Sequence, residues 1–328
     1  MLKILMLTSE WPTPAHPEYA PFIVRQVDYL RRTGIQIDLF HFRGAKSPVR
    51  YMQAWKTVQS KLAHNRYDLI HAQFGQSGLL AILPKSLPLV VTFRGSDLEG
   101  IVDNNGHYSL MGKVLQIIGR AVARRSDQVI VVSQSLARFL SRCDYHIIPS
   151  GLDLELFHPL GQAEARRALG INSTQPLVFF GGNPDVSIKR YGLAQAAFAR
   201  VKDRFPESAM LAAKGIAHSQ IPLYLNAADV LLLTSLHEGS PNVVKEALAC
   251  NLPVVSTAVG DVRERLGSVE GCVVCADDSP ETIAEGLTRV LTKRQRIEGR
   301  AAVQDLDEKV VTRKVIEVYH LALGRTAH

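Results

Sequence analysis

The sequence predicts an α/β protein built from two doubly wound, Rossmann-like domains. Its 328 residues are enough for two domains, each able to bury a core. Short apolar runs alternate with helical patterns along the whole chain, in two successive series. These runs are nearly continuous in Val, Ile and Leu, which is typical of parallel strands buried on both faces.

Each series places long helical patterns between its strands, as crossover connections require. The predicted strands are Lys3–Thr8, Ile35–Phe40, Leu69–Gln73, Leu89–Phe93, Gln128–Val132, His146–Pro149, Leu177–Phe180, Ala209–Ala213, Val230–Thr234, Val254–Ser256 and Gly271–Cys275. The predicted helices include Phe22–Thr33, Gly112–Arg125, Leu193–Asp203, Val243–Cys250 and the amphipathic Lys309–Leu323. We expect a linker near Gly151–Gly161 and domains spanning residues 1–157 and 158–308. Ligands of such sheets collect at the carboxyl ends of the strands, so we expect the site between the two domains.

Composition excludes several classes of protein. With 46% apolar and 21% charged residues, the chain is not intrinsically disordered. Its first apolar run, Leu2–Leu7, is too short for a membrane span or a signal-peptide core. Four cysteines do not make a disulfide framework, so a cytoplasmic location is expected. We expect a structural role for Cys272 and Cys275, which would point to opposite faces of one strand.

The net charge of +7 is concentrated in the first half of the chain. Between Asp38 and Asp68 there are six cations, no acid and, on a predicted helix, three interleaved large side chains. A helix of this kind can lie on an anionic membrane surface, bind an anionic substrate, or simply be a solvated face. No recognisable motif accompanies the charge, so nucleic acid is not expected as a partner. The residues concerned are Arg43, Lys46, Arg50, Lys56, Lys61 and Arg66, with Tyr51, Met52 and Trp55.

The most informative segment is Leu231–Cys250, where a buried strand leads through a loop into a helix. Ser240 is a suitable N-cap and Pro241 suits the first helical position. Glu238, Asn242 and Glu246 would then gather around the helix start, whose free N–H groups and positive dipole end favour a phosphate. An ordinary capped helix preceded by an incidental acid is the alternative.

The stretch Glu238-Gly-Ser-Pro-Asn-Val-Val-Lys-Glu246 resembles the signature of the retaining GT-B glycosyltransferases of family 4. Further segments are similar to the family's motifs, in the same order along the chain: Tyr67–Phe74, Val90–Asp97, Ile148–Asp153, Ala228–Val230 and Pro253–Thr257. The resemblance implies the GT-B fold, with the helix at 309–328 returning to an acceptor-binding first domain and the donor bound by residues 158–308.

The resemblance also implies roles for individual residues. Glu238 would bind the donor sugar near the reacting carbon, and Glu246 the ribose hydroxyls of the nucleotide. Lys189 would hold the diphosphate and stabilise the charge that grows on it. The segment Gly239, Ser240, Pro241, Asn242 and Val243 would line the sugar and diphosphate.

Three positions depart from the family's pattern. Asn183 replaces a cation, so Arg190 would have to supply the missing charge. Arg94 replaces a histidine near the reacting groups; it can bind a hydroxyl or phosphate but is not a neutral base. Ala20, within Pro17–Ile23, stands where a glycine would let the backbone approach phosphate.

Other candidates leave alternatives open. His71 either packs in the core or lines the site. Asp97 is expected to orient Arg94, with capping of the following segment as the alternative. Asp305 and Asp307 match an Asp-x-Asp metal pattern but are expected to form a solvated acidic cap, so no metal or other cofactor is expected.

The expected function is retaining sugar transfer from a UDP- or GDP-linked donor to a glycan or lipid-linked acceptor, in cell-envelope polysaccharide or glycolipid synthesis. The enzyme would be cytoplasmic, with a peripheral location at the inner face of the membrane as an open alternative. The alternatives are a catalytically lapsed nucleotide-sugar-binding subunit and a sugar-nucleotide epimerase or phosphorylase of similar architecture.

Overall fold

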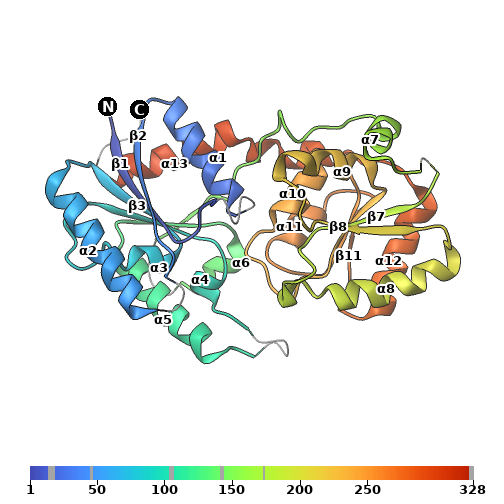
Figure 1. Ribbon diagram of the computed structural model, residues 1–328, viewed down its shortest axis with the longest axis horizontal. Coiled ribbons are helices and arrows are strands. Elements are labelled where there is room, and N and C mark those ends of the chain that lie inside the picture. Colours follow the sequence, from blue (N-terminus) through green and yellow to red (C-terminus); the bar gives the residue numbers. More distant parts are fainter. Residues whose placement is uncertain (14–18, 45–46, 103–106, 141–143, 173, 325–328) are drawn as a thin grey trace. The chain divides into compact units, whose positions relative to one another are not determined.

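A computed structural model describes residues 1–13, 19–44, 47–102, 107–140, 144–172 and 174–324 (Figure 1). Pro17, Glu18 and Lys46, which were singled out in the sequence, lie outside the described residues. The chain divides into two compact units. Unit 1 comprises Met1–Gly151 and Glu308–His328, and unit 2 comprises Leu152–Asp307. Residues 152–157 therefore belong to unit 2 rather than to the first domain, because Leu152, Leu154 and Phe157 are buried in the unit 2 core.

Unit 1 contains a six-stranded parallel sheet in the order β2-β1-β3-β4-β5-β6. Helices α1 and α13 cover one face and helices α2, α3 and α5 the other. The strands are β1 (Lys3–Thr8), β2 (Gln36–His41), β3 (Leu69–Gln73), β4 (Leu89–Phe93), β5 (Gln128–Val131) and β6 (His146–Ile147). The helices are α1 (Pro21–Arg32), α2 (Pro48–His64), α3 (Gly75–Gly78), α4 (Ser96–Glu99), α5 (Leu110–Arg125), α6 (Gln134–Ala137) and α13 (Glu308–Ala322).

Unit 2 contains a five-stranded parallel sheet in the order β11-β10-β9-β7-β8. Helices α8 and α12 cover one face, and α9 and α10 the other. The strands are β7 (Leu177–Phe180), β8 (Ala209–Ala212), β9 (Val230–Leu233), β10 (Val254–Ser256) and β11 (Val273–Val274). The helices are α7 (Gln162–Leu169), η1 (Ser187–Lys189), α8 (Tyr191–Arg204), η2 (His218–Gln220), α9 (Ile221–Ala227), α10 (Asn242–Ala249), α11 (Val262–Leu266), α12 (Pro280–Lys293) and η3 (Gly299–Leu306).

Strands β5, β8 and β9 end one residue earlier than predicted, and β6 and β11 are shorter than predicted by two residues or more. Strand β6 ends at Ile147 because Pro149 has no N–H to continue a ladder. Strand β11 begins at Val273 because Gly271, with φ of +91°, has a left-handed rather than an extended backbone. Both are outermost strands, where fewer hydrogen bonds hold the chain extended.

The C-terminal helix α13 belongs to unit 1, where it packs against α1. Val311, Val315 and Val318 recur at helical spacing and are buried. A buried ion pair fixes the start of the helix, since Arg25 Nε lies 3.0 Å from Glu308 Oε2 and the same guanidinium donates to Gly151 O. This closes unit 1 from two distant parts of the sequence.

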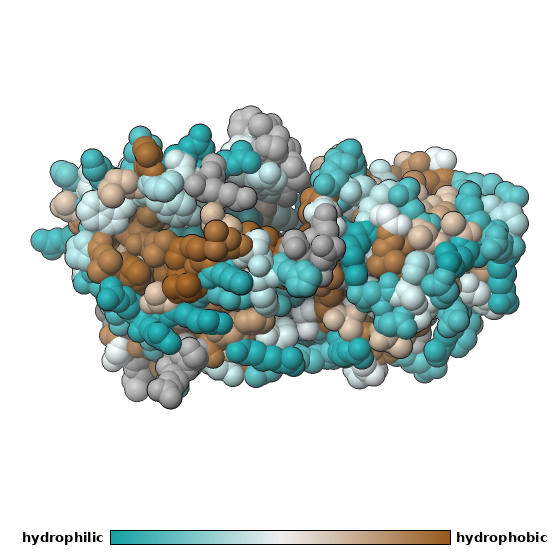
Figure 2. Space-filling model, turned by 90° about the horizontal axis from the view of Figure 1, so that it is seen from below, coloured by the Kyte–Doolittle hydropathy of each residue, from teal (hydrophilic) through white to brown (hydrophobic). Residues whose placement is uncertain are grey.

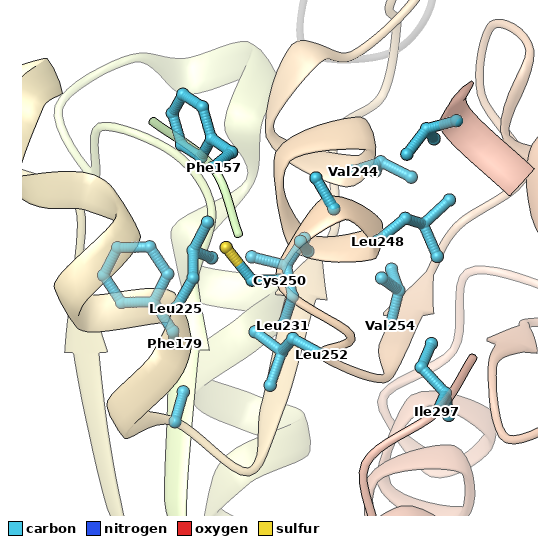
Figure 3. Packing of buried hydrophobic residues seen from close by; sticks show 14 of the residues in the cluster. Phe157, Phe179, Leu225, Leu231, Val244, Leu248, Cys250, Leu252, Val254 and Ile297 are labelled. Carbon is cyan, nitrogen blue, oxygen red and sulfur yellow. The ribbon is translucent and has the colours of Figure 1, made fainter. Parts of the chain in front are cut away.

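In unit 2, α10 is held by an apolar core beneath it (Figure 3). Val244 and Leu248 project from the helix toward the sheet residues Leu231 and Val254, and all four are at most 1% exposed. This packing fixes the position of the helix that carries Asn242 and Glu246, and therefore the backbone positions of both residues.

Candidate active site

The strand order of unit 2 reverses direction between β7 and β9, which is where doubly wound sheets bind their ligands, beyond the carboxyl ends of the strands. The segment after β7 begins with two glycines that permit close packing. A Cβ on Gly181 would lie 3.0 Å from Val243 Cγ1, and one on Gly182 would lie 3.1 Å from Lys189 Cγ. The lack of side chains here therefore lets η1 and the start of α10 approach the end of β7.

Lys189 and Glu238 form an ion pair at this edge, with Nζ donating to Oε1. Ser235 Oγ donates to the same carboxylate oxygen over 2.8 Å. The two charged side chains remain 25% and 17% exposed, so both reach solvent. Thr234 Oγ1 holds the η1 segment in place by donating to Lys189 O over 2.8 Å. The structure thus brings together two residues that the sequence analysis assigned to one site, and adds Ser235 to them.

Arg190 has a different environment from its neighbour. Its backbone is left-handed, with φ of +51°, and its guanidinium turns back toward the protein. Nε donates to Thr234 O over 2.7 Å, and the terminal nitrogens donate to Ser235 O and to Asp278 Oδ2. These contacts join the loop to the end of β9. Arg190 therefore stabilises the loop that carries Lys189, and its guanidinium forms an ion pair with Asp278.

Asn183 is exposed and opens the turn after the two glycines. Its Oδ1 accepts a hydrogen bond from the Asp185 backbone N–H over 3.0 Å, which is an Asx turn. This contact uses the side-chain oxygen of Asn183 and not its NH2 group.

The start of α10 differs from the prediction by one residue. Pro241 is the N-cap, Asn242 is the first helical residue, and no side chain caps the helix. Ser240, predicted to be the N-cap, instead donates from Oγ to Asp261 Oδ2 over 2.7 Å. Proline has no side-chain acceptor, so no side chain at the N-cap position competes for the first helical N–H groups. A helix start of this kind can bind an anion through its backbone.

The loop after β10 contacts the loop that carries Glu238. Gly260 has φ of +55°, and a Cβ there would lie 2.8 Å from Gly239 O and 2.9 Å from Glu238 O. A larger residue would have to displace this backbone. Gly260, which the sequence analysis did not single out, thus sets the position of Glu238 through main-chain packing.

Glu246 is almost buried, at 5% exposure, and its partner is a residue that the sequence analysis missed. His218 Nε2 lies 2.9 Å from Glu246 Oε1, and the His218 ring meets the Phe157 ring edge-on at 5.4 Å between centroids. His218 belongs to the short helix η2, between β8 and α9, where no periodic pattern marks a functional position. The structure therefore pairs the second glutamate of the motif with a partly exposed imidazole.

In unit 1, Arg94 follows β4, and its guanidinium donates to neutral acceptors with carboxylates nearby. Its guanidinium donates to Gln73 Oε1 over 2.7 Å and to Ser150 Oγ over 2.7 Å, and lies 4.7 Å from the centre of the Phe22 ring. Burial lowers the pKa of Arg94 to about 10, so it remains a cation at neutral pH. A base is thus absent at this position, as the residue type predicted.

The Asp97 carboxylate does not bind the guanidinium of Arg94, contrary to the favoured prediction that it orients this side chain. Its carboxylate accepts backbone N–H groups from Gly75, Arg94 and Gly95 over 2.9, 3.0 and 2.8 Å. Three main-chain donors surround the buried carboxylate, so Asp97 joins the turn after β4 to the start of α3. No side chain caps the helix α4 that follows, so the alternative prediction, capping of the following segment, is not confirmed either.

His71 is a core residue. It is fully buried, with Nδ1 2.7 Å from Tyr319 Oη of α13 and Nε2 2.8 Å from Thr92 Oγ1. Burial and, to a lesser extent, the charge of Arg94 lower the pKa of His71 to about 3, so the ring is neutral at physiological pH. Of the two open interpretations, core packing is the one that the structure supports.

Ala20 is the N-cap of α1 and has a left-handed backbone, with φ of +46° and ψ of +47°. Its methyl group packs in the core of unit 1 and is 6% exposed. The structure thus shows a glycine-type backbone at the position where the sequence departs from a glycine.

The cysteine pair and the first of the two acids have the following surroundings. Cys272 packs against the core on one face of the unit 2 sheet and Cys275 lies in the core on the other, as predicted from their spacing. Asp305 is exposed and faces Arg265, whose NH1 lies 3.5 Å from Asp305 Oδ2. Among the described residues there is no group of three His, Cys, Asp or Glu side chains arranged to hold a metal ion.

Comparison with known proteins gives the context for these geometries. Residues 4–156 match the family model "Glycosyltransferase Family 4", and residues 212–293 match "Glycosyl transferases group 1". The chain is 27% identical to the putative teichuronic acid biosynthesis glycosyltransferase TuaC of Bacillus subtilis, covering 88% of this chain and 89% of TuaC. The chain belongs to the family 4 glycosyltransferases.

A second relative of this glycosyltransferase is the D-inositol 3-phosphate glycosyltransferase of Xylanimonas cellulosilytica, at 26% identity over 79% of this chain and 73% of the relative. Among solved structures, sucrose-phosphate synthase from Thermosynechococcus elongatus superimposes with a TM-score of 0.78 at 18% identity, covering 99% of this chain and all of that one. HepE from Anabaena, solved with UDP and glucose, superimposes with a TM-score of 0.71 at 15% identity, covering 97% of this chain and 99% of HepE. The glycosyltransferase therefore has the GT-B fold that the resemblance implied.

None of the described helices of this glycosyltransferase combines the length and the apolar composition needed to cross a bilayer.

Proposed function

We propose that this glycosyltransferase moves a sugar, with retention of anomeric configuration, from a UDP- or GDP-linked donor to a glycan or lipid-linked acceptor. Unit 2 would bind the donor and unit 1 the acceptor. The observation that carries the proposal is the grouping of the Lys189–Glu238 pair with the uncapped start of α10 at the reversal point of the unit 2 sheet. That HepE was solved with UDP-glucose is consistent with this donor class.

The proposed chemistry follows from charge. When the bond between the anomeric carbon and the diphosphate breaks, negative charge grows on the leaving group. An ammonium has three donor hydrogens, so Lys189 can keep its bond to Glu238 and still donate to diphosphate oxygens. The first N–H groups of α10, reached along Gly239–Val243, would add to this stabilisation. No metal is needed in this scheme, because the protein supplies the positive groups itself.

Glu238 and Glu246 would then have separate tasks. Glu238, held by Lys189 and Ser235, would accept hydrogen bonds from hydroxyl groups of the donor sugar. Glu246, with one oxygen on His218, would accept the ribose hydroxyls of the nucleotide. Each carboxylate thus has a fixed protein partner on one oxygen and can use its remaining acceptor capacity for the ligand.

The acceptor is proposed to belong to cell-envelope polysaccharide or glycolipid synthesis, because TuaC is named for teichuronic acid biosynthesis. A cytoplasmic enzyme held at the inner face of the membrane would suit a lipid-linked acceptor. Of the cations predicted for this contact, Arg50 and Lys56 are exposed on α2, whereas Lys61 is paired with Asp38 at 3.0 Å. The proposed contact with an anionic membrane surface therefore relies less on Lys61 than on the exposed cations.

The experiment is a donor panel. The purified protein is mixed with UDP-, GDP- and ADP-sugars and extracts containing lipid-linked and soluble glycans, and released nucleoside diphosphate is measured in the presence of EDTA. We expect release with one nucleotide, and an NMR spectrum of the product showing the anomer of the donor. Activity lost with EDTA and restored by Mg²⁺ or Mn²⁺ would contradict the metal-free mechanism. Nucleotide binding without turnover would instead indicate a lapsed enzyme.

A further inference from the structure

An apolar groove runs between α2 and α5 on unit 1. Three side chains of α2 line it (Tyr51, Met52 and Trp55), as do three of α5 (Met111, Leu115 and Ile118), and the volume is about 650 Å³. We call it the α2–α5 groove. Pockets that bind small ligands have volumes in this range. The lining is almost wholly hydrocarbon and aromatic, which indicates an apolar ligand rather than a sugar or a nucleotide.

Apolar residues continue from the groove onto the open surface. Leu110, Val114 and Ile117 recur at helical spacing along α5 and are 82%, 40% and 66% exposed. Met52 on α2 and Leu83, after α3, are 55% and 59% exposed. Figure 2 shows the apolar surface in brown gathered on this part of unit 1. A contiguous exposed patch of this kind marks an interaction site.

The charges on the two helices indicate which partner covers this surface. Helices α2 and α5 together carry seven Lys and Arg residues and no Asp or Glu. Two copies of such a face would repel one another, which disfavours self-association. An anionic lipid surface offers both complements at once, since its headgroups attract the cations and its chains accept the apolar side chains.

The groove also has a polar end. Gln76, at the start of α3, lines the groove and donates from Nε2 to Ser9 Oγ over 3.0 Å. Its Oε1 is buried and has no hydrogen-bond partner among the described residues. Ser9 directly follows β1, so this end of the groove lies beside the carboxyl ends of the unit 1 strands. Ligands of doubly wound sheets bind at such ends.

We propose that the α2–α5 groove binds the hydrocarbon chain of an anionic membrane lipid, with the headgroup end directed toward Gln76 and the carboxyl ends of β1 and β3. The inference rests on the proposed transfer to a lipid-linked acceptor and assigns the lipid part of that acceptor to this groove. Surface contact alone would use the exposed patch and the cations; chain binding requires the interior of the groove.

Trp55 provides a direct probe, because it lines the groove and the chain has only one other tryptophan, Trp11. In a Trp11→Phe background, the full-length protein is mixed with vesicles of phosphatidylglycerol and phosphatidylcholine. The lipids carry either ordinary acyl chains or chains brominated along their length. Bromine quenches tryptophan only at close range, so we expect several-fold lower Trp55 emission with the brominated anionic vesicles. Co-sedimentation is measured in parallel.

Two substitutions distinguish the interior of the groove from the surface around it. Leu115→Gln changes the lining and should abolish most of the quenching. Ile117→Gln changes the exposed patch outside the groove lining, which a folded protein tolerates, and should only weaken the quenching. Thr57→Gln, on an exposed part of α2 outside the groove, is the matched control and should leave it unchanged.

Vesicle binding without quenching of Trp55 would overturn the proposal and indicate surface adsorption alone. Absence of vesicle binding would also overturn it, as would a dimer that shields Trp55 without lipid. None of these measurements uses a donor sugar or turnover. The groove and the proposed transferase function can therefore fail separately.

Discussion

Arg94 in unit 1 and Lys189 in unit 2 are both cations beyond the carboxyl end of a parallel sheet, but their surroundings differ. Arg94 donates to neutral oxygens of Gln73 and Ser150 and lies on the Phe22 ring. Lys189 is paired with a carboxylate and remains a quarter exposed beside an uncapped helix. When the N–H groups of a cation are already hydrogen-bonded to neutral protein oxygens, few remain for a ligand, and the side chain has a structural role. A flexible ammonium with one anionic partner retains donors for a ligand.

The same difference separates Lys189 from Arg190, which is next to it in the sequence. The guanidinium of Arg190 is bound to two main-chain oxygens and Asp278. The two residues thus provide a comparison within one loop between a cation that holds the site together and one that can act on the donor.

Lys189→Ala should have the largest effect on catalysis. Loss of the ammonium that stabilises the leaving diphosphate should lower kcat/KM at least about a hundredfold, near 2.7 kcal/mol in the transition state. Steady-state kinetics with the donor found in the panel gives the value. Lys214→Ala, which removes an exposed lysine paired with Asp185, is the matched control and should be close to wild type. A loss below about fivefold would show that another group stabilises the charge.

Glu246→Ala should weaken nucleoside diphosphate binding by about 1–3 kcal/mol, because a carboxylate that accepts ribose hydroxyls is lost. Calorimetry on the free nucleotide measures this without turnover. His218→Ala should weaken binding by less, since it removes only the partner that positions Glu246, and His218→Gln should restore part of the loss. Unchanged affinity in Glu246→Ala would remove this residue from the nucleotide site.

Much of the unit 2 site could be predicted because its signals are local. A buried apolar strand, a loop and a helix follow one another at Leu231–Cys250, which places Glu238 and Glu246 near a helix start. The cap was misplaced because proline suits both the N-cap and the first helical turn, and Ser240 finds a partner 21 residues away in sequence. His218 gave no signal, since its role comes only from the folding of a loop onto α10.

In unit 1, the partner of Asp97 was wrongly predicted, because the sequence does not show which backbone N–H groups the fold brings close to its carboxylate. Asp97 was expected to pair with a neighbouring charge, but three backbone N–H groups meet its carboxylate after the chain turns at β4. Leu110, Val114 and Ile117 also recur at helical spacing, and these side chains are exposed. A period identifies a helix and an apolar side, but not whether the protein itself covers that side.

His71 tests whether the polar groups of unit 1 belong to its scaffold. The folded-state pKa is about 3, below the ordinary value of 6.5, so between these values the unfolded chain binds a proton that the folded protein does not. The contribution of His71 to stability is therefore complete above about pH 6.5 and declines as the pH falls toward 3.

From pH 7 to pH 5.5 the free energy of unfolding should fall by about 1 kcal/mol because of His71, and a His71→Gln variant should lack this decrease. Urea unfolding at both pH values gives the slope, which is independent of any constant loss from the substitution. His64→Gln, an exposed histidine at the end of α2, is the control. Equal slopes in wild type and His71→Gln would mean that His71 is not buried in its neutral form.

Ala20→Gly should have the smallest effect. A left-handed backbone costs an alanine about 1–2 kcal/mol, which glycine would recover, but glycine also loses about 0.5–1 kcal/mol more conformational freedom on folding. Removal of the buried methyl group costs about another 0.8 kcal/mol. These two costs together offset the gain, so the free energy of unfolding should change by less than about 1 kcal/mol. Ala20→Val, which places a β-branched side chain on the same backbone in a buried position, should destabilise clearly more.

The kinetic result for Ala20→Gly then decides what the turn does. The Ala20 methyl packs into the core with α1, so it should be part of the scaffold, and the KM for the donor should stay within about threefold of wild type. A fall in KM of tenfold or more would show that this methyl holds the donor away from the backbone. In that case the turn before α1 would be a ligand-binding element like the start of α10, and the contrast between the two units would be smaller than their hydrogen bonds indicate.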